Sequence, residues 1–146
     1  MLKVMLILEI IGHAVNMYCD RRLSIFPNGT FSFETIGHIK EEGYLKHVLN
    51  GVSASVPMFS SVLGVFAIVL EFFVYLSLAI YVYQKSEIFG ILLFLATIFF
   101  CILASDYHVK TGLSEYVFIK LGMDEKAKDV MIDLMNKGSI LRLCFF

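Results

Sequence analysis

The chain has 146 residues, of which 58% are hydrophobic and 17% are charged. Soluble domains average about 45–50% apolar and about 25% charged residues. The composition therefore favours an integral membrane protein over a soluble all-helical protein. The expected partner is the lipid bilayer. The formal net charge is −1 and no run of basic residues occurs, which argues against a nucleic-acid partner.

The first predicted span, residues 2–18, carries more polar groups than full contact with lipid allows. Glu9, His13 and Asn16 recur at i, i+4 and i+7, so they share one face of a helix. The opposite side is apolar. We therefore expect this helix to turn its polar face into a bundle of helices.

A polar connection follows at residues 20–51. Pro27, Asn28 and Gly29 form a strong turn signal, because Asn and Gly tolerate positive φ. We expect a small hairpin over residues 25–33. The spacing of apolar residues then predicts a short amphipathic helix within residues 35–50.

Two long apolar runs, residues 56–83 and 88–107, are the second and third predicted spans. About 20 apolar residues cover a hydrocarbon core of about 30 Å, so both runs are long enough. Only residues 84–87 separate them, which favours an antiparallel pair. We expect the third helix to end near residue 107 and residues 113–121 to form a separate interfacial segment.

The C-terminal part has a polar helix and a final apolar run. Residues 124–137 combine an apolar stripe with acidic residues in the first turn and a lysine in the last, as an amphipathic surface helix does. Residues 139–146 are apolar, as the first turns of a fourth span that is cut short would be; alternatively, they form a tail that docks against the other helices. The predicted fold is therefore all-α: one membrane domain, residues 1–146, with three spans, a truncated fourth and a surface helix.

Basic residues predict the orientation of this domain. With three crossings, the lysines and arginines on one side include Arg21, Arg22, Lys40, Lys46, Lys110, Lys120, Lys126 and Lys128. The other side has only Lys3 and Lys85. Because basic residues are enriched in cytoplasmic loops, we expect the N-terminus outside.

Glu71 is the most informative residue, because it is a carboxyl group near the middle of an apolar run. An ionisable group there is costly unless it is paired or protonated, and it marks a candidate functional site. At about 1.5 Å per residue, His13 and Glu71 lie at nearly one depth. Glu9, His13 and Glu71 are thus predicted to form a cluster that handles protons or cations, performs acid–base catalysis, or only locks two helices together.

A second predicted cluster lies at the inner boundary: Asp106, His108, Arg21 and Arg22. Here we expect polar residues at the end of a span, with Asp106 paired to Arg21 or Arg22, in a layer separate from the Glu71 cluster.

The sequence has no pattern typical of a metal site. The three cysteines are too widely spaced to match a metal-ligand motif, and Glu9 with His13 lacks the paired Glu-x-x-His motifs of di-iron bundles. We predict no metal and no cofactor.

Two functions remain open from the sequence. One is a small membrane subunit or transport component for a small solute or ion, which as a three-span protein implies a homo-oligomer or a larger assembly. The other is an intramembrane enzyme for a lipid-soluble substrate, with the same residues as acid and base; a purely structural membrane fragment is the third alternative. A polar first helix followed by an apolar hairpin resembles several groups of small bacterial membrane proteins, which implies a bacterial cell membrane.

Overall fold

The computed structural model describes residues 2–31, 41 and 43–137. Within them the chain forms α1 (Leu2–Ser24), β1 (Ile25–Phe26), β2 (Gly29–Thr30), α2 (Tyr44–Leu49), α3 (Ser55–Tyr83), α4 (Glu87–Lys120) and α5 (Glu125–Lys137). Most of the described chain is helical, and the predicted all-α class is confirmed.

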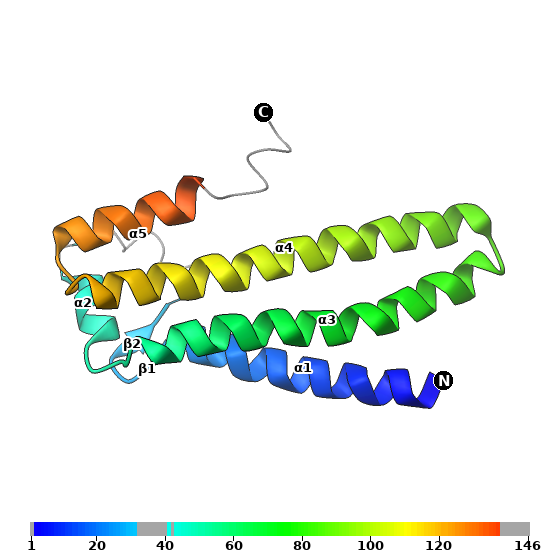
Figure 1. The fold of residues 1–146 in the computed structure, drawn as a ribbon, viewed down its shortest axis with the longest axis horizontal. Helices are drawn as coiled ribbons and strands as arrows, with labels where there is room; N and C mark the ends of the chain where they lie inside the picture. The colour runs from blue at the N-terminus through cyan, green and yellow to red at the C-terminus, as the bar shows by residue number, and fades with distance from the viewer. Residues whose placement is uncertain (1, 32–40, 42, 138–146) are drawn as a thin grey trace.

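The three long helices form the body of the molecule (Figure 1). α3 lies between the other two and packs along both, whereas α1 and α4 touch each other at few positions. The N-terminus lies at the end where α3 turns into α4, and the short elements gather at the opposite end (Figure 1). This arrangement places the polar connection and the C-terminal helix at one end.

Two of these helices, α3 and α4, are long and apolar enough to cross a membrane. α1 is not among them, so the first of the three predicted spans stays a prediction. The pattern of exposed side chains agrees with an apolar environment for α3 and α4, because large apolar residues such as Phe66, Phe89 and Leu92 face outward. The predicted partial span, residues 139–146, lies outside the described residues.

The predicted end of the third helix was wrong. α4 continues without a break through Lys120, so residues 113–121 are not a separate segment. At about 1.5 Å per residue, 34 residues extend about 51 Å, well beyond a hydrocarbon core of about 30 Å. The polar residues 106–110, which were predicted to end the helix, lie inside α4. They are accommodated there because Asp106 pairs with Lys110 one turn away and His108 is buried.

α3 and α4 approach most closely at small residues. A Cβ atom on Gly112 would lie 2.4 Å from Cβ of Ser61 and 2.6 Å from the carbonyl oxygen of Pro57. A Cβ atom on Gly90, at the other end of the pair, would lie 2.4 Å from Cα of Tyr83. Glycine at both ends therefore lets the two backbones come together along their length.

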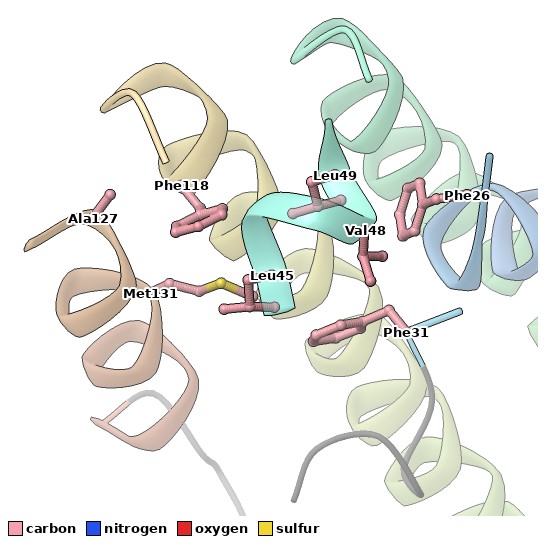
Figure 2. Packing of buried hydrophobic residues seen from close by; sticks show 8 residues of the cluster. All are labelled: Phe26, Phe31, Leu45, Val48, Leu49, Phe118, Ala127 and Met131. Atoms are coloured by element: carbon pink, nitrogen blue, oxygen red, sulfur yellow. The ribbon is translucent and has the colours of Figure 1, made fainter. Parts of the chain in front are cut away.

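The short elements and the last turns of α4 form a compact unit that we call the head. Its core joins the hairpin, α2, α4 and α5 through eight buried residues (Figure 2): Phe26, Phe31, Leu45, Val48, Leu49, Phe118, Ala127 and Met131. Ile25 pairs with Thr30 and Phe26 with Gly29, so the hairpin predicted around Pro27 is confirmed for these residues. α5 begins where Oδ1 of Asp124 accepts a hydrogen bond from the backbone of Ala127.

Candidate functional site

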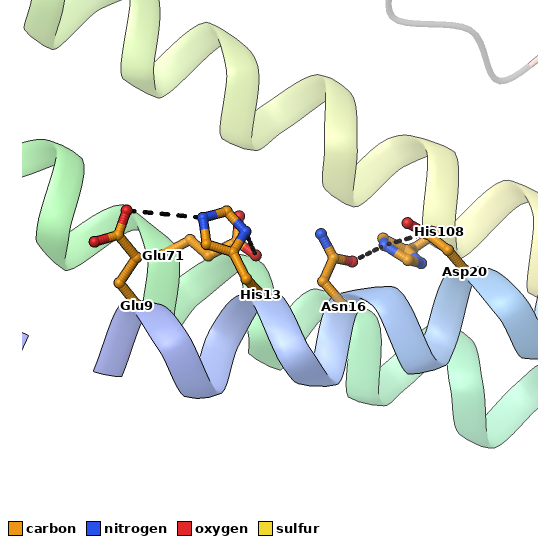
Figure 3. Close-up of polar contacts among 6 residues, drawn as sticks. All are labelled: Glu9, His13, Asn16, Asp20, Glu71 and His108. Carbon is orange, nitrogen blue, oxygen red and sulfur yellow. Dashed lines mark hydrogen bonds and ion pairs between the residues drawn. The ribbon is translucent and has the colours of Figure 1, made fainter. Parts of the chain in front are cut away.

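One face of α1 carries four polar side chains, Glu9, His13, Asn16 and Asp20, which we call the polar stripe. They recur at i, i+4, i+7 and i+11, so they lie along one face of a straight helix. Figure 3 shows them in a row, with Glu71 of α3 and His108 of α4 reaching the same row. The stripe therefore connects ionisable groups from all three long helices.

Glu71 lies near the middle of α3, and its side chain is only 1% exposed. Nδ1 of His13 lies 3.1 Å from Oε1 of Glu71, within ion-pair distance, although the two atoms are not aligned as a hydrogen bond. Nε2 of His13 lies 3.7 Å from Oε1 of Glu9. The structure thus brings the three predicted residues together, with His13 between two carboxyl groups (Figure 3).

The exposure of the three side chains differs sharply. Glu71 is enclosed, whereas His13 is 48% exposed and Glu9 is 26% exposed. Gly12 helps to enclose the carboxyl group, because a Cβ atom there would lie 3.0 Å from Cγ of Glu71. One carboxyl group is therefore held inside the bundle, and its partner imidazole reaches the surface of the chain.

His108 joins the polar stripe farther toward the head. Its Nε2 atom lies 2.7 Å from Oδ1 of Asn16 and 3.5 Å from Oδ1 of Asp20. Its Nδ1 atom is buried and has no hydrogen-bond partner among the described residues. The ring fits there because α3 has a glycine opposite: a Cβ atom on Gly64 would lie 2.5 Å from Nδ1.

The predicted boundary cluster is not formed as expected. Asp106 pairs with Lys110 on its own helix, and Arg21 and Arg22 lie exposed at the end of α1. Lys110 lies one helical turn from Asp106, so the helix itself places the two side chains within contact distance. Arg21 and Arg22 are on another helix and could reach Asp106 only if tertiary packing brought them there. His108 nevertheless contacts Asn16 and Asp20 of the polar stripe, the stripe whose other end meets Glu71, while the separation of the two clusters in depth stays a prediction.

The structure adds two residues to the predicted site, Asn16 and Asp20. Oδ1 of Asn16 lies within hydrogen-bonding distance of Nε2 of His108. Asp20 completes the stripe. Extending the i, i+4, i+7 pattern by one more turn, to i+11, would have included Asp20, so the sequence did contain this signal.

Glu115 is a second enclosed carboxyl group, located beyond the predicted span 88–107. It is fully buried, and neither of its carboxyl oxygens has a hydrogen-bond partner within the described part of the chain. It lies on α4 between Gly112, which contacts α3, and Phe118, which belongs to the head core. Burial disfavours the ionised form and raises the pKa of Glu115 well above its ordinary value of 4.5.

This burial makes the stability of the fold depend on pH. Because the native state holds the Glu115 proton more tightly than the unfolded chain, the free energy of unfolding should fall as pH rises from 4.5 toward the raised pKa. Glu115→Gln should remove this fall, which amounts to about 1.4 kcal/mol for each unit by which the pKa is raised. Thermal unfolding followed by circular dichroism in detergent, from about pH 4 to about pH 8, measures it.

The matched control for this prediction is Glu125→Gln in the exposed first turn of α5. It should leave the pH dependence as in the wild type. An unchanged slope in Glu115→Gln would show that another group carries the pH dependence.

These contacts define what the site can do chemically. A carboxyl group and an imidazole 3.1 Å apart can share or exchange a proton, and a second carboxyl group adjoins the imidazole. No three His, Cys, Asp or Glu side chains among the residues that the structure describes are grouped to hold a metal ion.

The fold and the site define a class: a helical protein with two helices suited to crossing a membrane and with ionisable groups enclosed between its long helices. Within this class, the chain belongs to DUF6796, a family of unknown function, whose model matches residues 1–145. No curated protein and no solved structure matches the chain.

Proposed function

We propose that the protein is a three-span integral membrane protein that serves as a proton- or cation-handling component of a transport system. The observation that carries the proposal is the enclosure of Glu71 in the middle of an apolar helix, beside His13. Ionisable side chains inside membrane helices are rare, and those that occur commonly mark ion pathways and proton relays.

α1 is the third span in this proposal. It is 23 residues long, about 35 Å at the rise of a helix, and it packs along α3. Its side away from α3 is apolar and exposed, with Leu6, Ile7 and Ile10 among its residues. Contact of the exposed apolar face with lipid, and contact of the polar stripe with the other helices, would account for the mixed composition of α1.

The orientation with the N-terminus outside a bacterial cell membrane also belongs to the proposal. The head end carries most lysines and arginines of the described chain. Lys3 at the start of α1 and Lys85 between α3 and α4 belong to the other end, where the N-terminus and the turn from α3 to α4 lie (Figure 1). Single cysteines at positions 85 and 126, in a chain freed of its own cysteines, test this in intact cells. A membrane-impermeant thiol reagent should label position 85 and spare position 126; the reverse pattern would contradict the orientation.

The acid–base site offers a specific chemistry. A proton on His13 leaves an ion pair with Glu71, and a proton on Glu71 leaves both groups neutral. The two states hold the same single proton on different groups, and the free-energy difference between them is kept small because the opposite charges of the ion pair are adjacent. Such a pair can bind and release a proton without a large rearrangement of the helices.

Proton flux into proteoliposomes tests the function. The purified full-length protein, in vesicles loaded with a pH-sensitive dye, should carry protons down a pH gradient faster than empty vesicles. Glu71→Gln keeps the size of the side chain but cannot ionise, so it should reduce this flux at least tenfold, about 1.4 kcal/mol or more in activation free energy.

The matched control is Glu87→Gln, at the exposed start of α4. It should leave the flux unchanged. Wild-type vesicles that conduct no better than empty ones would rule out proton conduction by this chain. A Glu71→Gln variant that unfolds in detergent would identify the carboxyl group as a structural lock between α1 and α3.

A homo-oligomer or larger assembly is part of the proposal. His13 is 48% exposed and Asp20 is 52% exposed on the surface of a single chain. Exposure of such groups to hydrocarbon is costly, so protein or water must cover those that lie within the membrane. A second copy of the chain is the simplest cover.

The alternative is an intramembrane enzyme for a lipid-soluble substrate. It would be favoured by an apolar pocket that reaches Glu71. The structure has an apolar hollow of about 300 Å³ between α3 and α4, but its lining begins at Leu76 and does not include Glu71. Transport therefore has the better support.

A further inference from the structure

We infer that Asn16, His108 and Asp20 form the route by which Glu71 exchanges protons with the head side of the protein. This inference rests on the proposed function, because it concerns the access route to the same site. The contacts along the route are close: Nε2 of His108 lies 2.7 Å from Oδ1 of Asn16 and 3.5 Å from Oδ1 of Asp20. Asn16 follows His13, the partner of Glu71, by about one turn on the same face of α1.

The route leads from an enclosed group to an exposed one. Glu71 is 1% exposed, whereas Asp20 is 52% exposed near the head end of α1. The polar stripe extends about 16 Å from Glu9 to Asp20 at the rise of a helix. In the described part of the chain α1 and α4 meet at few positions, and His108 of α4 forms polar contacts there with Asn16 and Asp20 of α1.

His108 is the proton carrier, because it has two ring nitrogens in different surroundings. With the amide oxygen of Asn16 as acceptor, Nε2 holds a proton and also lies near the Asp20 carboxylate. Nδ1 is then free to accept a proton. It lies against Gly64, which is i−7 from Glu71 and so on the same face of α3.

The transfer balances in protons and moves no electrons. A proton from the Glu71 side binds Nδ1 and gives an imidazolium ion, which then releases the Nε2 proton to the Asp20 carboxylate. A second exchange, or rotation of the ring, restores the starting tautomer. Asn16 is a positioning residue, because its amide orients His108 but does not itself ionise.

Gly64 and Glu71 are seven residues apart on α3, about 10 Å along the axis, so a short chain of water molecules is the natural link between Nδ1 and Glu71. Both Nδ1 of His108 and Oε1 of Glu71 are buried and lack hydrogen-bond partners among the described residues. Buried polar atoms without a protein partner are usually satisfied by water, which also conducts protons between such groups. The remaining groups that face His108 are few: Asn16 and Asp20 from α1, Gly64 from α3, and the neighbouring ring of Tyr107 at 5.9 Å.

Sided acid pulses test the route. Full-length protein is reconstituted into vesicles, and vesicles with one protein orientation are selected by capture through a biotinylated cysteine at position 126. After the pulse, the infrared band of the protonated Glu71 carboxyl group is followed in time. Glu71→Gln identifies the band. In the wild type, a pulse on the head side should protonate Glu71 quickly.

His108→Gln should slow the response to a head-side pulse at least tenfold and leave the response to a pulse on the N-terminal side unchanged. Glutamine can still hydrogen-bond Asn16 but cannot carry a proton. Gly64→Ala should have the same sided effect without altering any titrating group, because its Cβ atom would occupy the space at Nδ1. His47→Gln, an exposed histidine on α2, is the control and should behave as the wild type.

The outcomes separate this inference from the proposed function. If His108→Gln responds to the head-side pulse as fast as the wild type, or slows equally for both pulses, the route is wrong while the Glu71 site stands. If the wild type has no band that Glu71→Gln removes, or that band does not respond to either pulse, the proton-handling function itself fails.

Discussion

Replacing Phe118 by alanine should unfold the head while leaving the long helices in place. Phe118 is 2% exposed and lies where α4 meets α2 and α5 (Figure 2). Truncation of a buried phenylalanine costs about 3–5 kcal/mol, because transfer energy is lost and a cavity remains. The head is small, so a loss of this size should exceed what its core supplies.

Limited proteolysis and circular dichroism in detergent measure the effect. Phe118→Ala should expose cleavage sites in α2 and α5, whereas most of the helical signal should persist. Phe99→Ala is the control: it is the same change on the same helix, at a side chain that is 46% exposed, and it should leave the proteolysis pattern unchanged. Equal cleavage of both variants would show that the head core does not depend on Phe118.

Replacing Gly112 by leucine should separate the head-side ends of α3 and α4. Even the first carbon of a side chain would lie 2.4 Å from Cβ of Ser61 and 2.6 Å from the backbone oxygen of Pro57, so the helices would have to move apart. Overpacking of a closed contact typically costs about 1–3 kcal/mol, and leucine should reach or exceed the top of that range. The lower helix propensity of glycine offsets only about 1 kcal/mol of it.

Thermal unfolding in detergent measures this change, with Leu113→Ala at the adjacent exposed position as the control. The Gly112→Leu variant should unfold at a clearly lower temperature and the control should not. Gly112→Ala combined with Ser61→Gly should recover part of the stability lost in Gly112→Ala, because one of the two clashing atoms is removed. Absence of any recovery would place the strain on the Pro57 oxygen alone.

The sequence by itself determined the features that arise from local chemistry. The helical class and the apolar runs of α3 and α4 follow from composition, and the hairpin follows from the turn at Pro27–Gly29. The spacing of Glu9, His13 and Asn16 placed them on one face, and counting helical rise placed His13 level with Glu71, as the 3.1 Å contact requires. Whether these residues form a working site stays a prediction.

Only the tertiary structure decided how the helices continue and which polar groups meet. Asp106, His108 and Lys110 looked like the end of a helix, but the head packs around the last turns of α4 and keeps them helical through Lys120. His108 meets Asn16 and Asp20 because Gly64 on a third helix leaves room for its ring. Helix periodicity specifies which side chains share a face, whereas the pairing of faces on different helices depends on close packing between elements far apart in the chain.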